Sequence, residues 1–288
     1  MKIKKINIQG LFGLVNNDFN IECYPNEKIS IVYAFNGAGK TTLLRLIYAA
    51  SKNDKSTLKA IPFKNLELVF NDGKIISIEK VNPKAEDYTY RIDGKMADEV
   101  MLAELQKEFK VTSIFANKDY NRGISTSTND EMLSVDVNPI VRIERELREK
   151  IKDPVQKGKV EELRDIINKN FTMTFKHLDI QDNELIAAPD SKYPDDPVLP
   201  IHELSSGEIK LILMFYDLLF ETADHSIVLL DEPESSLHVD WQKDLLRTII
   251  DTCADRDIQI IVATHSPDVV EDYFTQLTPM LSKRYAAE

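Results

Sequence analysis

The chain is poor in cysteine and contains no long apolar run. Its only cysteines, Cys23 and Cys253, lie far apart and belong to no C-x-x-C pair and no histidine spacing of the kind that binds zinc. We therefore expect two reduced structural thiols and no zinc site. No apolar stretch reaches the length of a transmembrane helix, and residues 1–8 alternate like a β-strand instead of forming a signal peptide. These absences predict a cytoplasmic protein without a membrane partner.

Positive charge is also scarce relative to negative charge. With 36 Lys and Arg against 48 Asp and Glu, the 288 residues carry a formal net charge of −12. This balance argues against a surface coated with phosphate contacts, although a local basic groove could form where two copies meet. Nucleic acid therefore stays an unproven partner. The hydrophobic content of 43% is that of an ordinary globular chain, and we expect one elaborated domain over residues 1–288.

One stretch has the order strand, glycine-containing turn, helix. An apolar run at residues 29–33 is followed by a turn and then by apolar residues at helical spacing. The turn and the helix start read Asn36-Gly37-Ala38-Gly39-Lys40-Thr41-Thr42. Glycines let successive backbone N–H groups face phosphate oxygens, and the following helix points its positive N-terminus at the same anion. Lys40 would reach the β- and γ-phosphates, and the Thr41 hydroxyl would bind Mg²⁺.

This phosphate loop departs from the usual G-x-x-x-x-G-K-[ST] pattern at one position. Ala34 stands where the pattern begins with glycine. That position shapes the start of the loop and does not touch phosphate, so we expect the loop to bind phosphate all the same.

The first half of the chain alternates apolar and polar residues and predicts an antiparallel β layer beside the phosphate loop. Expected strands cover residues 2–8, 19–23, 29–33, 66–70, 74–79, 88–92 and 111–116, and expected helices cover 41–51 and 97–109. An Asp-Gly turn at residues 72–73 indicates a hairpin. In the loop at residues 10–14, Phe12 either packs as an ordinary apolar side chain, the interpretation we favour, or stacks on a nucleotide base.

The middle of the chain predicts an insert at about residues 123–200. Residues 123–130 are polar and typical of a mobile loop, and residues 140–151 and 159–170 form charged amphipathic helices. Their charged faces are most simply solvated, and a docking surface is the alternative. A hairpin at residues 172–188 and an acidic, proline-rich loop complete the insert.

A serine-rich segment after residue 203 opens a further helix. It reads Leu204-Ser205-Ser206-Gly207-Glu208. Taken alone, this is an ordinary N-cap with Ser205 or Ser206 as the capping residue. A serine and a glycine at a helix start can also bind an anion through free N–H groups and a hydroxyl.

Two apolar strands end in polar residues near the end of the chain. The strand at residues 227–230 runs into Asp231 and Glu232, which are costly to bury unless they face a cation and a reacting water. Asp231 would hold Mg²⁺, and Glu232 would deprotonate the attacking water. A helix is expected over residues 239–253, and the strand after it, at residues 259–264, ends at His265, which would lie beside the γ-phosphate.

In this order, the motifs resemble those of ABC-type ATPases, in the soluble branch that includes the SMC, RecF and OLD-like proteins and the AAA-family ATPases of antiphage defence. The resemblance covers nearly the whole chain. Its segments are the phosphate loop at 36–42, the signature at 204–208, the pair Asp231-Glu232, the D-loop Ser235-Ser236-Leu237-His238 and the switch His265. The signature and the D-loop look like those of the OLD-like and RecF-like group. The chain has no long heptad region for the arms of an SMC protein, and we expect no room after His265 for a nuclease half.

The resemblance implies an α/β fold of the ABC-type P-loop class, with a central, mostly parallel sheet, an antiparallel β layer and a helical lid insert. It also implies a homodimer that closes face to face on two ATP·Mg²⁺, with the signature of one copy against the γ-phosphate held by the other. Lys40, Glu232 and His265 would be catalytic, and Thr41 and Asp231 would hold the metal. The family's magnesium-sensing glutamine is not evident, and Asn117 is the candidate substitute. Without such a residue, hydrolysis is expected to be slow.

We therefore expect an ATPase switch. Because the chain shows no second catalytic constellation, the switch would regulate a separate effector, by resemblance a nuclease or toxin in antiphage defence. The alternative is a RecF-like clamp that grips DNA in its ATP state, with steeply salt-dependent affinity. The ATP subunit of a membrane transporter ranks lower, because the signature is altered and the glutamine is missing.

Overall fold

The structure is a computed structural model that describes residues 1–115, 138–171 and 174–281. The chain divides into two compact units, each described here by itself. Unit 1 comprises residues 1–116, 222–235 and 243–288, and unit 2 comprises residues 117–221 and 236–242. The loop expected at 123–130 and the candidate Asn117 lie outside the described residues. Within the described ranges, no helix is long and apolar enough to cross a membrane.

A parallel sheet of five strands forms the centre of unit 1. Its order is β14 (Leu277–Pro279), β3 (Ile29–Tyr33), β13 (Ile258–Thr264), β12 (Ser226–Asp231), β8 (Val111–Phe115). Every residue of β12 and β13 is buried, as expected of central strands covered on both faces. Tyr33 pairs with Thr264, and Asp231 pairs with Ala263. Because these strands are parallel and in register, the residues that follow β3, β12 and β13 emerge at one edge of the sheet.

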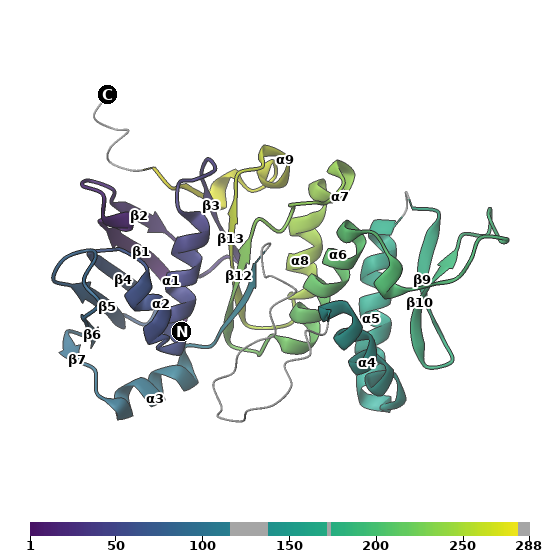
Figure 1. The fold of residues 1–288 in the computed structure, drawn as a ribbon, viewed down its shortest axis with the longest axis horizontal. Helices are drawn as coiled ribbons and strands as arrows, with labels where there is room; N and C mark the ends of the chain where they lie inside the picture. Colours follow the sequence, from purple (N-terminus) through teal and green to yellow (C-terminus); the bar gives the residue numbers. More distant parts are fainter. Residues whose placement is uncertain (116–137, 172–173, 282–288) are drawn as a thin grey trace. The chain divides into compact units, whose positions relative to one another are not determined.

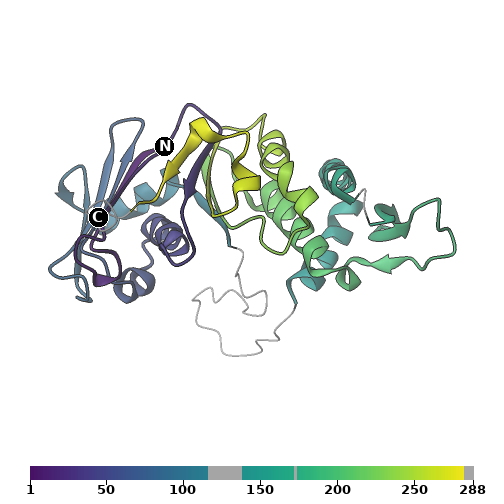
Figure 2. The same cartoon turned by 90° about the horizontal axis from the view of Figure 1, so that it is seen from above.

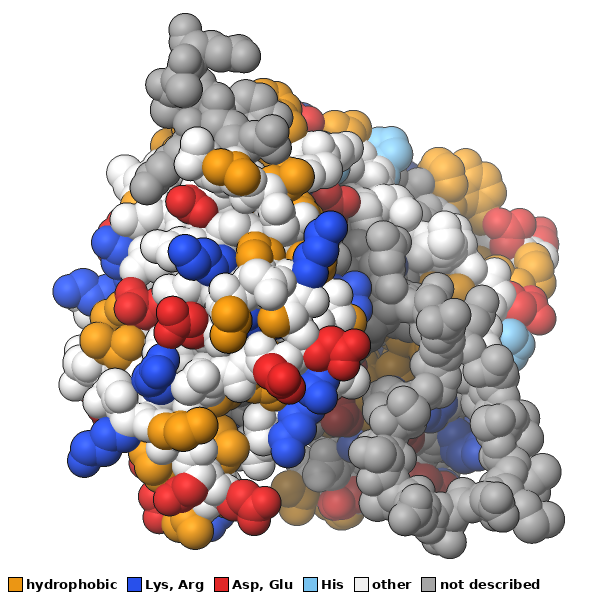
Figure 3. All heavy atoms as spheres, turned by 60° about the vertical axis from the view of Figure 1, so that its left-hand side comes forward, with side chains coloured by type: hydrophobic (Ala, Val, Ile, Leu, Met, Phe, Trp, Pro, Cys, Tyr) orange, Lys and Arg blue, Asp and Glu red, His pale blue; other side chains and the backbone are white. Residues whose placement is uncertain are grey.

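A second sheet of unit 1 is antiparallel. Its order is β2 (Phe19–Glu22), β1 (Ile3–Gln9), β4 (Asn65–Phe70), β5 (Ile75–Lys80), β6 (Tyr88–Ile92), β7 (Lys95–Met96). Alternate residues of these strands are buried, and their neighbours carry charges of both signs, such as Lys5 beside Glu22 at 3.2 Å and Arg91 beside Glu79 at 3.0 Å. Figure 3 shows the basic and acidic side chains of this side of the molecule interspersed. The predicted antiparallel layer is confirmed.

Helix α1 (Lys40–Lys52) packs between the two sheets of unit 1 (Figures 1 and 2). Its buried residues Leu43, Leu44 and Ile47 belong to one hydrophobic core with inward residues of both sheets. The Gln259 side chain adds a polar link, because it accepts a hydrogen bond from Ile3 N at 2.8 Å and donates one to Ile3 O at 2.7 Å. The core therefore fixes the start of α1 relative to both sheets.

Shorter helices differ from the prediction in two places. Unit 1 contains α3 (Glu99–Glu108), α9 (Pro267–Val270) and α2 (Lys55–Ala60). The sequence analysis did not predict α2, which the Asp54 side chain caps. The helix expected over residues 239–253 is interrupted at Asp244, whose φ of −96° and ψ of 1° separate α7 (Val239–Lys243) from α8 (Leu245–Thr252). Residues 239–242 of α7 are assigned to unit 2, and α8 is assigned to unit 1.

The described part of unit 2 also contains three longer helices and a small antiparallel sheet. The helices are α4 (Pro139–Lys152), α5 (Pro154–Asn170) and α6 (Ser206–Tyr216), and the sheet order is β11 (Leu199–Pro200), β10 (Glu184–Pro189), β9 (Lys176–Gln181). Helix α5 starts earlier than predicted because Asp153 caps it at Val155 N with a 2.9 Å bond, which leaves Gly158 inside the helix. A π-helical turn, Asp217–Glu221, follows α6.

Candidate functional site

The phosphate loop of unit 1 has the backbone that its glycines predict. Gly37 and Gly39 adopt the left-handed region, with φ of 81° and 102°. Gly39 is the N-cap of α1, and among the described residues no side chain caps this helix. A Cβ atom on Gly39 would lie 2.9 Å from Leu11 Cδ2 and 3.1 Å from Phe12 Cε2. A curled loop that ends on a helix N-terminus without a side-chain cap fits an anion such as a phosphate.

Lys40 curls back across this loop. Its side chain is 4% exposed, and its Nζ donates to the carbonyl oxygens of Ala34 at 2.9 Å and Phe35 at 3.3 Å. Ala34 therefore contributes a backbone carbonyl, and its φ is not positive. This explains why alanine is accommodated where the pattern usually has glycine.

Three candidate catalytic residues meet at one carboxylate oxygen. Glu232 Oε1 lies 3.4 Å from Lys40 Nζ and 3.1 Å from His265 Nδ1. Glu232 itself is left-handed, with φ of 46°, and its N–H donates to Ala263 O at 2.8 Å. The register of β3, β12 and β13 thus brings together side chains that are far apart in the sequence.

The candidate metal ligands also lie in unit 1. Asp231 is 3% exposed at the end of β12, and Thr41 is exposed in the first turn of α1. Across residues 1–115, 138–171 and 174–281, no group of three His, Cys, Asp or Glu residues could hold a metal by itself. Mg²⁺ is usually held by one or two carboxylates together with substrate phosphates, so this donor set fits magnesium that arrives with a nucleotide.

A largely apolar hollow of about 1010 Å³ adjoins the phosphate loop. Phe12 stands in its wall at φ of 62°, 38% exposed, and its N–H donates to Pro62 O at 2.7 Å. The hollow is lined by Phe12, Leu14, Asn17, Phe19, Tyr33, Ala34, Phe35, Asn36, Gly37, Ala38, Pro279, Met280 and Leu281. Phe12 therefore packs against Gly39, as favoured from the sequence, and also faces a space that could receive a base. The contribution of residues 279–281 had no sequence signal, because it depends on β14 pairing beside β3.

The signature segment lies in unit 2, at the start of α6. The Ser205 side chain and Glu208 form a capping box, in which Glu208 Oε2 accepts from Ser205 N at 2.9 Å and from Ser205 Oγ at 2.7 Å. Glu208 is 2% exposed, and its Oε1 lies 3.1 Å from Lys176 Nζ in β9. The Glu208 carboxylate therefore caps the N-terminus of α6, whereas Ser205 and Ser206 are exposed.

The D-loop packs against the signature within unit 2. A Cβ atom on Gly207 would lie 2.8 Å from Ser236 O, so this close backbone approach requires glycine. Leu237 is buried, and His238 is exposed with its Nδ1 3.3 Å from Asp240 Oδ2. Ser235 is the last residue of this stretch assigned to unit 1. The predicted signature and D-loop residues from Ser236 onward thus form one cluster.

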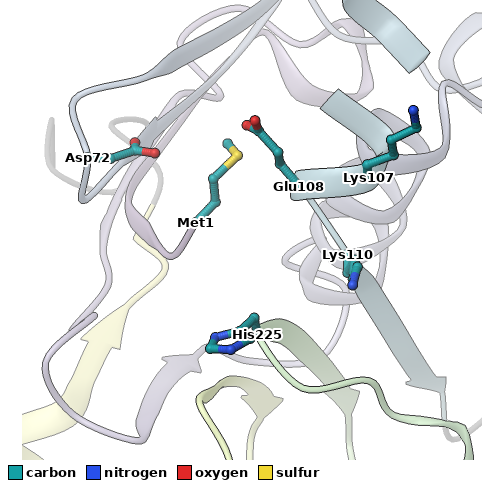
Figure 4. Close-up of a pocket in the computed structure, with 6 residues that line it drawn as sticks. All are labelled: Met1, Asp72, Lys107, Glu108, Lys110 and His225. Atoms are coloured by element: carbon teal, nitrogen blue, oxygen red, sulfur yellow. The ribbon is translucent and has the colours of Figure 1, made fainter. Parts of the chain in front are cut away.

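A second hollow, of about 370 Å³, lies at the opposite end of the parallel strands, where β8 and β12 begin. It is lined by Met1, Asp72, Lys107, Glu108, Lys110 and His225 (Figure 4). Its charges are of both signs, and two of its side chains already have partners, since Glu108 binds Lys74 and His225 Nδ1 lies 2.9 Å from Asp257 Oδ2. This hollow is therefore less suited to binding a phosphate chain than the glycine loop is.

Comparisons with known proteins agree with this arrangement. A family model described as "AAA domain, putative AbiEii toxin, Type IV TA system" matches residues 36–271. The UvrABC system protein A of Clostridium acetobutylicum is 25% identical over 292 residues, which cover 92% of this chain and 30% of that protein. The chain thus spans less than a third of this curated relative.

Two solved structures share the fold. An SMC head bound to the C-winged helix domain of ScpA matches with a TM-score of 0.54 and 16% identity, over 98% of this chain and 95% of that chain. The SMC head domain from Thermotoga maritima matches with a TM-score of 0.52 and 16% identity, over 97% and 94%. The expected α/β fold, with a parallel sheet, an antiparallel sheet and helices, is confirmed.

Proposed function

The chain belongs to the family described as "AAA domain, putative AbiEii toxin, Type IV TA system" and is an ABC-type ATPase domain, and from this we propose that it is an ATP-hydrolysing switch. In this proposal two copies close face to face on ATP·Mg²⁺, and the closed state regulates a separate effector, such as a nuclease or toxin in antiphage defence. One observation supports the catalytic part of the proposal, namely that Lys40 Nζ and His265 Nδ1 both lie close to the same carboxylate oxygen, Glu232 Oε1.

The contacts of Lys40 suggest how nucleotide binding would prepare the site. Lys40 Nζ is held by Ala34 O, Phe35 O and Glu232 Oε1. A triphosphate in the glycine loop would draw the ammonium group away from Glu232, because a triphosphate carries several negative charges and the Glu232 carboxylate carries one. Glu232 would then be available as a base, held in direction by His265 Nδ1.

Metal binding in this proposal falls to Thr41 and Asp231. Mg²⁺ would neutralise charge on the phosphates. The chain's own share is to hold the metal through a hydroxyl at the start of α1 and a buried carboxylate at the end of β12. Asn117, proposed to replace the family's glutamine, lies outside the described residues.

The dimer part of the proposal rests on the signature. Ser205 and Ser206 are exposed at the start of α6, where a second copy could present a γ-phosphate. Gly207 and the D-loop are packed together, so they would move as one surface. The link to an effector is supported only by the description of the family and by the absence of a second catalytic constellation in the sequence.

The test compares two variants and one control variant of the tagged protein, each recovered from its own host's lysate, with and without ATP·Mg²⁺. We expect Glu232→Gln to bind ATP, to hydrolyse it at least about 100-fold more slowly, and to form a dimer that carries a further protein. Lys40→Ala is expected to lose nucleotide binding and to stay monomeric, whereas Lys52→Ala, on the last turn of α1, is the matched control. Normal turnover in Glu232→Gln would overturn the assignment of the base. A bare monomer with ATP bound would overturn the face-to-face dimer.

A further inference from the structure

A buried carboxyl group lies beside the site, and the mechanism above does not use it. Glu234 is 3% exposed, and its Oε1 accepts a short hydrogen bond from the hydroxyl of Thr264. Among the described residues, its Oε2 has no hydrogen-bond partner. A buried carboxyl with a single partner is costly, so its retention calls for a physical reason.

Thr264 connects three parts of unit 1. It is the last residue of β13 and is fully buried. Besides donating to Glu234, its Oγ1 accepts from Ser266 N at 3.0 Å, and its carbonyl accepts from Ala34 N at 3.2 Å at the start of the phosphate loop. His265 lies between Thr264 and Ser266, so its backbone is held on both sides.

Glu234 reaches Thr264 because of a tight turn after β12. Ser235 N donates to Glu232 O at 3.0 Å across Pro233 and Glu234, and Glu232 N donates to Ala263 O at 2.8 Å. The turn that bears Glu232 is therefore joined to the end of β13 twice, once by its backbone at Ala263 and once by Glu234 at Thr264.

We propose that Glu234 is a positioning residue, which acts through Thr264 to fix His265 Nδ1 at 3.1 Å from Glu232 Oε1. It is too buried to touch a nucleotide, so its effect must pass through the end of β13. The kinetic consequence of this inference rests on the proposed ATPase function, but its structural consequence does not.

The charge state of Glu234 selects the conservative variant. Burial, and to a lesser extent the nearby Glu232 carboxylate, raises the pKa of Glu234 above its ordinary value, while the Thr264 hydrogen bond opposes the shift. Burial thus favours the neutral form of Glu234 more than it does for an exposed glutamate, and this carboxyl accepts from the Thr264 hydroxyl. Gln offers the same acceptor without a charge, whereas Ala removes it.

The kinetic experiment separates positioning from general stability. Glu234→Ala and Thr264→Val are compared with Glu234→Gln and Thr264→Ser by single-turnover ATP hydrolysis and by the Kd for ATP. We expect the first two to slow hydrolysis by about 10-fold or more, with the Kd within about 3-fold of wild type, because small misplacements of a catalytic group are costly. The two conservative variants should stay within about 3-fold for both quantities, by the same reasoning.

A cycle with His265→Ala tests the route of the effect. If Glu234 acts by placing His265, Glu234→Ala causes no further loss of rate in the His265→Ala background. An equal loss in both backgrounds, or a loss of ATP affinity as large as the loss of rate, would show a general structural role and overturn the proposal.

A readout without ATP separates this inference from the proposed function. In the nucleotide-free protein, we expect the NMR signals of the His265 ring to shift in Glu234→Ala and to stay unchanged in Glu234→Gln. A wild type that does not hydrolyse ATP, together with this shift, would remove the ATPase function and leave the positioning role. An active wild type with neither the shift nor a rate loss in Glu234→Ala would remove the positioning role alone.

Discussion

Helices α1 and α6 both have a glycine and a serine or threonine at their start, but their N-terminal N–H groups are capped differently. At α1 the N-cap is Gly39, no described side chain caps the helix, and its first turn has no acidic residue. At α6 the N-cap is Ser205, Glu208 completes a capping box, and Lys176 pairs with the same carboxylate. Both helices carry a partial positive charge at this end, but only α6 satisfies it from within the chain.

The difference shows which helix start has no side-chain cap from the described part of its own chain. A phosphate at α1 would supply the acceptor atoms and the negative charge that Glu208 supplies at α6. The same sequence feature, a small polar residue beside glycine, therefore has two outcomes, and the residue three positions later decides between them. At α6 that residue is glutamate, and at α1 it is Thr42.

The strongest way to break this comparison is to add one methyl group at the start of α1. Gly39 has a left-handed backbone conformation, and the added Cβ atom of Gly39→Ala would have to displace Leu11 or Phe12. The loop would therefore shift and lose charge-assisted hydrogen bonds to phosphate. We expect ATP affinity to fall on the order of 100-fold, since each such bond contributes about 1.5–3 kcal/mol. Isothermal titration with ATP and Mg²⁺ measures it.

Gly73→Ala is the matched control. Gly73 is also left-handed, with φ of 89°, but a Cβ there meets no atom within 4 Å. Both variants should lose about 1–2 kcal/mol of stability from backbone strain, and only Gly39→Ala should lose ATP. Equal loss of ATP affinity in both variants would contradict a phosphate site at α1.

The α6 side of the comparison predicts a loss of stability in place of a loss of ligand. Lys176→Met leaves the buried Glu208 carboxylate without its partly exposed cation, and we expect the stability of unit 2 to fall by about 1–3 kcal/mol. Urea unfolding followed by tryptophan fluorescence measures it, because the single tryptophan, Trp241, is buried in unit 2 and stacks on Phe171.

A surface ion pair provides the control for this variant. Lys152 and Glu149 lie 2.8 Å apart, but both side chains are more than half exposed. Lys152→Met should change stability by less than about 0.5 kcal/mol, as is usual for exposed pairs. The ATP affinity of the isolated chain should be unchanged in both variants. A loss of ATP affinity in Lys176→Met alone would mean that the capping box serves nucleotide binding directly.

Local patterns were sufficient for much of the fold. The bounds of β3 and β6 agree with the strands predicted at residues 29–33 and 88–92, and the Asp-Gly turn joins β4 to β5 as predicted. Helix α2 was missed because six residues are too few to show a helical period, although Asp54 is a typical N-cap. The interruption at Asp244 could not be predicted, because residues 239–253 contain no glycine or proline.

Some features of the site could likewise be predicted from local sequence, and others depend on contacts between residues far apart in the chain. The phosphate loop and the polar ends of β12 and β13 could be read from the sequence, and the parallel register then brings Lys40, Glu232 and His265 together. The hydrogen bond between Glu234 and Thr264 joins residues 30 positions apart and has no pattern of its own. For the same reason, the inward turn of Glu208 could be predicted as a capping box, but its pairing with Lys176 could not.

The smallest expected effect concerns Phe12, which touches both the phosphate loop and the apolar hollow. If its ring stacks on the base, Phe12→Ala should weaken ATP binding by about 3- to 10-fold, the range of an aromatic stacking contact. Binding of inorganic tripolyphosphate, which has no base, should then be unchanged.

If Phe12 only packs on Gly39, removing its ring loosens the loop itself, so ATP and tripolyphosphate should weaken by the same factor. The ratio of the two affinities therefore decides between stacking and packing. A loss of affinity confined to ATP would show that the nucleotide site extends from the start of α1 into the hollow. An equal loss of affinity for both ligands would show that Phe12 supports the phosphate loop alone.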